Sequence, residues 1–144
     1  MVGTNWADYV MDEGKDVIVF YHATFCNACK GFAEVWKELA SHVSLVKDLT
    51  VAHMDGSENE VEGLEFKLHG SFPCVRLYPR EDKTKVSQFI FDVDQDGQVD
   101  ERSLKDVREF LTEHSAVFRD AKKSGLLFYE EENVLTEETI IEDL

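Results

Sequence analysis

The chain has 144 residues, 43% of them hydrophobic and 31% charged, so it is long enough for one domain with a substantial core. Its 30 acidic residues against 15 basic ones leave a formal net charge of −15, which argues against nucleic acid and anionic membranes as partners. No apolar stretch is long enough to span a bilayer, so we expect no membrane insertion. One CxxC pair plus an odd third cysteine is not typical of a disulfide-stapled scaffold.

The periodicity of the apolar residues predicts an alternation of strands and helices that ends in a hairpin and a helix. The expected elements, in chain order, are a helix over 5–11, a strand over 17–21, a helix from the CxxC pair to about 41–46, a strand over 50–54, a short helix over 57–68, strands over 74–78 and 86–91, and a helix over 103–114. This order predicts an α/β fold in which helices cover both faces of a mixed central sheet.

The two cysteines of the CxxC pair, Cys26 and Cys29, lie where the first buried strand passes into an amphipathic helix. Their spacing puts both side chains on one face of the first helical turn. Unpaired backbone N–H groups and the positive end of the helix dipole favour a thiolate there. A thiolate attacks disulfides, and a second thiol one turn away can resolve the mixed disulfide. The placement therefore predicts dithiol chemistry, with two alternatives: an inert buried pair, or half of a zinc site completed by Cys74 and His22.

Several spaced motifs resemble the thioredoxin superfamily, and more closely a catalytic domain of protein disulfide isomerase. They are residues 15–19, Phe25-Cys26-Asn27-Ala28-Cys29-Lys30, residues 51–55 and 59–64, Phe72-Pro73 and residues 102–104. The resemblance implies a thioredoxin-like catalytic domain over residues 1–115. We expect the acidic C-terminal extension, residues 116–144, to be partly disordered or docked on the domain, a neighbour or a client.

The resemblance implies a thiol–disulfide oxidoreductase that forms, reduces or rearranges disulfides in protein substrates. Cys26 would be the nucleophile and Cys29 the resolving thiol, with no organic or metal cofactor besides their redox-active disulfide. The implied partners are unfolded or disulfide-containing proteins, and glutathione or a partner oxidoreductase. An alternative is a client-binding adaptor domain with weak or no turnover.

The resemblance also assigns residues around the dithiol. Pro73 falls at the family's cis-proline and would shape the substrate groove with Phe25 and Phe72. Arg102 falls where isomerases carry an arginine that can swing toward the active site and modulate Cys29. The alternatives are a plain trans proline that opens a strand and a solvated loop arginine.

The chain departs from the family inside the active site. Asn27-Ala28 replaces the usual Gly-His, so we expect Cys26 to be less acidic and the site more reducing than a typical isomerase. Phe20 and His53 replace a buried acid and its lysine partner. Since Phe20 cannot accept a proton, we expect slower resolution unless His53 or His22 acts as a proton relay. The alternative for His22 is a half-buried packing residue.

Two further features allow functional interpretations. Cys74 could be a regulatory third thiol, although a cysteine that opens a central strand is more often a small buried hydrophobe. Acidic residues with the spacing of a calcium loop suggest a weak calcium site or a calcium-responsive module, but Ser103 replaces the bidentate glutamate and a solvated turn is the simpler interpretation. The candidate ligands are Asp92, Asp94, Asp96 and Asp100.

The chain ends in Ile141-Glu142-Asp143-Leu144, which resembles a signal for retrieval to the endoplasmic reticulum. We therefore expect location in the lumen of that compartment. Residues 1–5 do not resemble a signal peptide. This combination suggests a chain trimmed at its N-terminus, such as the last domain of a larger isomerase.

Overall fold

The computed structural model of the chain describes residues 5–56, 72–92, 94–96 and 98–127. Its elements are α1 (Trp6–Val10), β1 (Asp16–His22), α2 (Asn27–His42), β2 (Leu49–Asp55), β3 (Cys74–Tyr78), β4 (Ser87–Phe89), α3 (Leu104–His114) and α4 (Ala116–Lys123). The predicted strands and helices that fall within these residues are confirmed, with small shifts at their ends. The short helix predicted over 57–68 lies outside the described residues.

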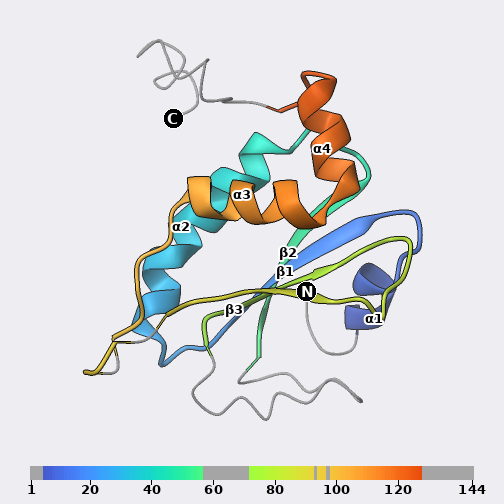
Figure 1. The fold of residues 1–144 in the computed structure, drawn as a ribbon. Coiled ribbons are helices and arrows are strands. Elements are labelled where there is room, and N and C mark those ends of the chain that lie inside the picture. Colours follow the sequence, from blue (N-terminus) through green and yellow to red (C-terminus); the bar gives the residue numbers. More distant parts are fainter. Residues whose placement is uncertain (1–4, 57–71, 93, 97, 128–144) are drawn as a thin grey trace.

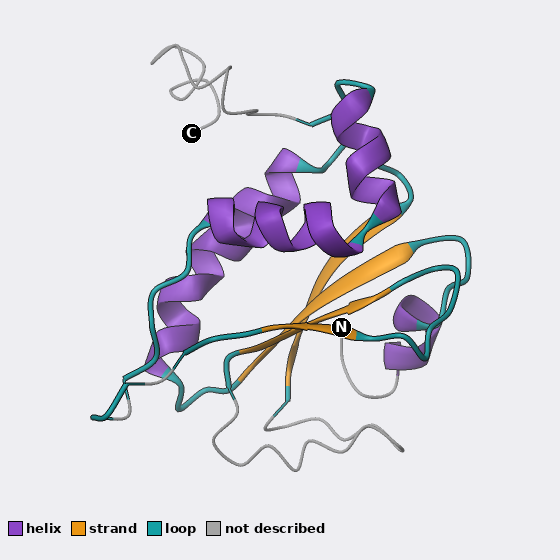
Figure 2. Cartoon of the chain, viewed as in Figure 1, coloured by secondary structure: helices purple, strands orange, loops and turns teal. Residues whose placement is uncertain are grey.

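The four strands form one mixed sheet in the order β2-β1-β3-β4. β1 pairs in parallel with β2 and antiparallel with β3, and β3 pairs antiparallel with β4. The helices α2, α3 and α4 lie on one side of this sheet and α1 on the other (Figure 1, Figure 2). The predicted α/β class, with helices on both faces of a mixed sheet, is confirmed.

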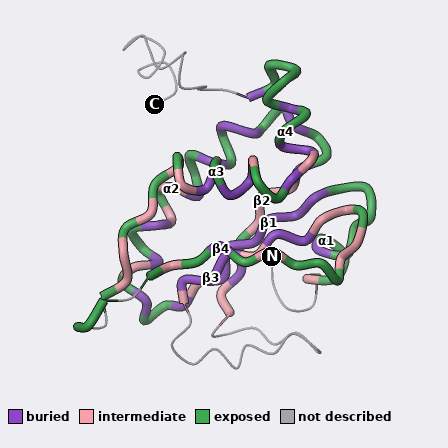
Figure 3. The backbone as a smooth tube through the Cα atoms, viewed as in Figure 1, coloured by how far each residue is buried: buried purple, intermediate pink, exposed green. Residues whose placement is uncertain are grey.

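The larger core fills the space between the sheet and α2, α3 and α4. Successive side chains of a strand point to opposite faces, so Ile18 and Phe20 of β1 join this cluster together with Trp36 and Leu39 of α2. Figure 3 shows the buried stretches of these helices turned toward the sheet. The first turn of α2, which carries the cysteine pair, is part of the same core because Cys26 and Cys29 belong to the cluster.

A smaller core lies on the opposite face of the sheet, under α1. Val17, Val19 and Tyr21 point to this side, and all three are fully buried. The Tyr21 and Tyr78 hydroxyl oxygens are 2.7 Å apart, and the indole N–H of Trp6 donates to the Tyr21 hydroxyl at 2.8 Å. The polar ends of these aromatic side chains are thus satisfied by one another, as buried hydroxyls require.

The helix α4 was not predicted from the sequence. Ser115 caps it, because its hydroxyl oxygen accepts the N–H of Phe118 at 3.0 Å and also donates to the buried carboxylate of Asp16 at 2.7 Å. Val117 and Phe118 are buried in the larger core. Residues 116–127 of the predicted extension therefore pack on the domain, and residues 128–144 lie outside the described residues.

No helix within the described part of the chain is both long enough and apolar enough to cross a membrane.

Candidate active site

The site centres on a disulfide between Cys26 and Cys29 at the start of α2. Cys26 is the N-cap residue, and its sulfur accepts the backbone N–H of Cys29 at 3.1 Å. The Cα atoms of the pair are 5.3 Å apart, and the residues are 8% and 4% exposed. The predicted placement on one face of the first helical turn is thus confirmed.

This position favours a negative charge on Cys26 once the disulfide is reduced. An N-cap side chain faces the unpaired N–H groups of the first turn, and a hydrogen bond to a charged acceptor is stronger than one to a neutral acceptor. The first turn of α2 contains no acidic residue that would oppose the charge. The arrangement therefore supports Cys26 as the thiolate nucleophile and Cys29, the more buried cysteine, as the resolving thiol.

An apolar surface flanks the disulfide on the side where Phe25, Phe72 and Pro73 lie. The peptide bond between Phe72 and Pro73 is cis, as the family resemblance implied. Phe25, which precedes the cysteine pair, is 69% exposed, and its ring meets that of Phe72 edge to face with 6.2 Å between the centroids. A cavity of about 510 Å³ adjoins this surface, and its lining includes Ala28 and Pro73. An exposed aromatic ring beside a reactive disulfide can bind apolar segments of a protein substrate.

Arg102 lines the same cavity, so the structure brings it to the edge of the active-site helix. Its guanidinium lies 3.4 Å from a carboxylate oxygen of Asp100 and 3.7 Å from one of Asp106, and it stacks over the ring of Phe89 at 4.7 Å. Sequence reasoning missed these three partners, although the i,i+4 spacing to Asp106 signals an ion pair. A movement toward Cys29 stays a prediction.

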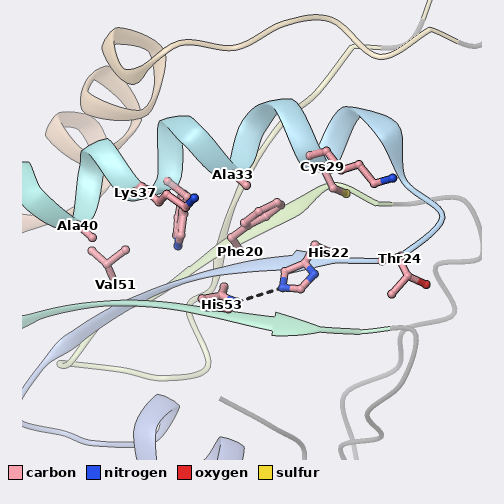
Figure 4. Close-up of a pocket in the computed structure, with 12 residues that line it drawn as sticks. Phe20, His22, Thr24, Cys29, Ala33, Lys37, Ala40, Val51 and His53 are labelled. Atoms are coloured by element: carbon pink, nitrogen blue, oxygen red, sulfur yellow. Dashed lines mark hydrogen bonds between the residues drawn. The ribbon is translucent and has the colours of Figure 1, made fainter. Parts of the chain in front are cut away.

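On the other side of α2, a cavity of about 420 Å³ lies behind Cys29 (Figure 4). Phe20 forms part of its floor, and His22 and His53 line it from neighbouring strands. Nε2 of His22 is 3.0 Å from Nδ1 of His53. Burial and the neighbouring His53 lower the pKa of His22 below its ordinary value, and the charge of Asp55 opposes this shift. The two predicted relay residues therefore lie together at the cavity that borders the resolving cysteine.

Cys74 lies away from this site, on the opposite face of the sheet. It pairs in register with Tyr21, belongs to the smaller core and is 1% exposed. Burial raises the pKa of its thiol, with Arg76 opposing the shift. This environment fits a small buried hydrophobe better than a regulatory thiol. It also leaves the cysteine pair without Cys74 as a zinc ligand.

The acidic segment after β4 forms a turn stabilised from within, over its described residues. One carboxylate oxygen of Asp94 accepts the backbone N–H groups of Asp96 and Gln98, each at 2.9 Å. The carboxylate of Asp100 accepts the N–H of Asp92 at 2.8 Å. Among the described residues no three His, Cys, Asp or Glu side chains converge as a metal site would require. These contacts are those of a solvated turn, the alternative to a calcium loop.

Residues 1–105 match the thioredoxin family, so the chain belongs to that family. Among curated proteins, the rabbit (Oryctolagus cuniculus) protein disulfide-isomerase is 32% identical, with 76% of this chain and 23% of that protein covered. The bovine (Bos taurus) protein disulfide-isomerase A4 is 31% identical, with 85% of this chain and 18% of that protein covered. The chain thus spans about a fifth of the length of these relatives.

Solved structures confirm the fold. Chloroplastic thioredoxin z superposes with a TM-score of 0.59 at 15% identity, with 78% of this chain and 89% of that chain covered. The first thioredoxin domain of mouse protein disulfide-isomerase A4 gives a TM-score of 0.54 at 17% identity, with 94% of this chain and 81% of that chain covered. The fold is therefore the thioredoxin fold, and within it the chain is similar to domains of protein disulfide isomerases.

Proposed function

We propose that this chain is a thiol–disulfide oxidoreductase of the protein disulfide isomerase type that acts on protein substrates. The observation that carries the proposal is the Cys26 sulfur at the N-cap of α2, bonded to Cys29 and in contact with its N–H. The similarity to protein disulfide isomerases supports the same chemistry.

The proposed bond changes take place among the two cysteine sulfurs and the sulfurs of the substrate. In reduction, the Cys26 thiolate attacks one sulfur of a substrate disulfide, and the other substrate sulfur leaves as a thiolate. Cys29 then attacks the Cys26 sulfur, which frees the second substrate thiolate and closes the Cys26–Cys29 disulfide. The substrate gains two electrons and the cysteine pair loses two. Oxidation of a substrate dithiol is the reverse sequence.

Substrate binding is proposed for the apolar surface beside the disulfide. Phe25, Phe72 and Pro73 would hold an extended or unfolded segment of a client next to Cys26. Glutathione or a partner oxidoreductase would then reset the redox state of the pair. These partners follow from the chemistry of the site and from its similarity to protein disulfide isomerases.

A redox titration tests the proposal and identifies the direction of the reaction. The fraction of Cys26–Cys29 disulfide is measured by thiol alkylation and mass across a series of glutathione ratios. A potential on the order of −180 mV indicates an oxidase or isomerase, and one on the order of −270 mV indicates a reductase. Absence of a Cys26–Cys29 pair at any ratio overturns the proposal.

Turnover is tested by the reduction of insulin with dithiothreitol as the electron donor. We expect Cys26→Ser to abolish the catalysed rate, because Cys29, the other cysteine of the pair, does not lie at the N-cap. Cys74→Ser is the matched control and keeps the rate, because Cys74 lies on the other face of the sheet. A Cys26→Ser variant as active as the wild type contradicts the proposal, and client protection that survives this substitution then favours an adaptor.

We place this function in the lumen of the endoplasmic reticulum, on the basis of the last four residues and the similarity to protein disulfide isomerases. The test directs the chain into the secretory pathway with an added signal peptide and compares it with a chain that lacks residues 141–144. We expect the chain with residues 141–144 to be retained in the endoplasmic reticulum and the chain that lacks them to be secreted. Equal secretion of both contradicts this location signal.

A further inference from the structure

The resolving step requires Cys29 to lose its proton in an apolar environment. Cys29 is 4% exposed and belongs to the core cluster under α2. Burial disfavours a thiolate, so attack by this sulfur is faster when a nearby base takes the proton. Phe20, which lies in the same cluster beneath α2, has no atom that can accept it.

The cavity behind Cys29 provides two bases. Of the side chains that line it, those of His22 and His53 carry an imidazole nitrogen that can accept a proton. Lys30 and Lys37 also line the cavity, but an ammonium group only donates. Figure 4 shows Cys29 on the helix side of the cavity and the two imidazoles on the strand side.

The contact between the imidazoles organises the proton positions. An N–H···N hydrogen bond at 3.0 Å requires one of the two facing nitrogens to carry the proton. When Nε2 of His22 donates to Nδ1 of His53, Nδ1 of His22 is an acceptor. The imidazolium that forms when His22 takes a second proton keeps the same bond. His53 is exposed, so its ring can exchange that proton with solvent.

We infer that His22 accepts the proton of Cys29 in the resolving step, and that His53 positions the His22 ring for this transfer. The Cys29 sulfur attacks the Cys26 sulfur of the mixed disulfide, the bond from Cys26 to the substrate breaks, and the substrate leaves as a thiolate. The proton passes to Nδ1 of His22, directly or through one water molecule. This inference rests on the proposed function.

The charges around His22 agree with a proton acceptor. Among the described residues, the titratable side chains that act on its charge are those of His53 and Asp55 from β2, and Lys30 and Lys37 of α2 line the same cavity. The strand β3 places its titratable side chains on the opposite face of the sheet. Burial and His53 lower the pKa of His22 below its ordinary value, which favours the neutral ring that can accept a proton.

The test separates the two thiol steps with dithiobis(nitrobenzoate), a disulfide that releases a coloured thiolate, in a Cys74→Ser background. The reduced protein should release one thiolate in a phase proportional to reagent concentration, from Cys26, and a second in a phase independent of it, from Cys29. We expect His22→Gln to slow the second phase at pH 7 by about tenfold or more and to leave the first unchanged. The wild-type second phase should also slow as the pH falls through the lowered pKa of His22, and the variant should lack this inflection.

Three further measurements distinguish proton transfer from a packing role. His114→Gln, the same replacement away from the cavity, should change neither phase. In His22→Ala, added imidazole should restore the second phase, and in His53→Gln the inflection should move. An unchanged second phase and pH profile in His22→Gln overturn the inference and leave the proposed function intact. Release of only one thiolate per molecule of the parent protein, with no Cys26–Cys29 disulfide formed, overturns the proposed function.

Discussion

At the scale of single residues, the two residues between the cysteines determine how strongly the reduced site stabilises the Cys26 thiolate. Asn27 is exposed, and Ala28 lines the groove beside Pro73. Neither side chain can be cationic, so the thiolate of Cys26 depends on the helix N-terminus and the N–H of Cys29. A less stabilised thiolate makes the reduced form less favoured, and the pair is then more reducing.

Replacing Ala28 by histidine tests this argument. We expect Ala28→His to make the reduction potential less negative, on the order of 30 mV, because an imidazolium at this position stabilises the Cys26 thiolate. The measurement is the glutathione titration with alkylation. Ala40→His, an exposed site near the other end of α2, is the control and should leave the potential unchanged. Equal potentials for the wild type and Ala28→His contradict the charge argument.

At the scale of elements, the start of α3 connects helix stability to the groove. Ser103 and Asp106 form a capping box, in which the Ser103 hydroxyl oxygen accepts the N–H of Asp106 and the Asp106 carboxylate accepts the N–H of Ser103 at 2.8 Å. The same carboxylate lies 3.7 Å from Nε of Arg102. The cap therefore fixes both the first turn of α3 and the arginine that borders the active site.

The capping box predicts a pH-dependent contribution to stability. The backbone N–H of Ser103 lowers the pKa of Asp106 below 3.8, so the folded state favours its charged form. The stabilisation is then present above the unfolded-state pKa and lost as the pH falls through the lower folded-state pKa. We expect Asp106→Asn to lower the melting temperature at pH 7, with the deficit shrinking below about pH 4. Glu109→Gln is the control on the same helix, and a deficit constant from pH 7 to pH 2 contradicts this origin.

The elements that the sequence predicted correctly are those with local signals. The strand before Cys26 and the helix that begins after Ser103 each depend on residues close in the chain. The helix α4 also has local signals, since Ser115 caps it and Gly125 follows it with a φ of +71°. Its eight residues are too few to be stable alone, so it depends on the burial of Phe118.

The site was predicted in part for the same reason. Both His22 and His53 were identified as candidate proton acceptors, but their contact depends on the register of β1 against β2, which pairs Phe20 with His53. The Cys74 environment likewise depends on which face of β3 meets the larger core. The register of paired strands and the side of the sheet to which each side chain points depend on long-range contacts. The sequence pattern of one strand does not determine them.

At the scale of the whole molecule, α4 closes the end of the core away from the cysteine pair. Asp16, at the start of β1, is 3% exposed, and its carboxylate accepts the N–H of Arg80 at 2.8 Å and the hydroxyl of Ser115 at 2.7 Å. The strand that starts at Asp16 leads directly to Cys26. The end of the domain and the active site are therefore joined by one buried strand, and the hydrogen bond from Ser115 holds the start of α4 against the start of that strand.

This connection predicts where the folded domain ends. We expect a chain that ends at residue 115 to unfold at a much lower urea concentration than a chain that ends at residue 127, because the shorter chain lacks the buried side chains of α4. Phe118→Ala should cost about 3–5 kcal/mol in the free energy of unfolding, because it leaves a cavity in a fully buried site. The exposed control Lys122→Ala should cost about 0.5 kcal/mol or less. Equal urea midpoints for the chains that end at 115 and 127 would show that α4 is dispensable and that the domain ends before it.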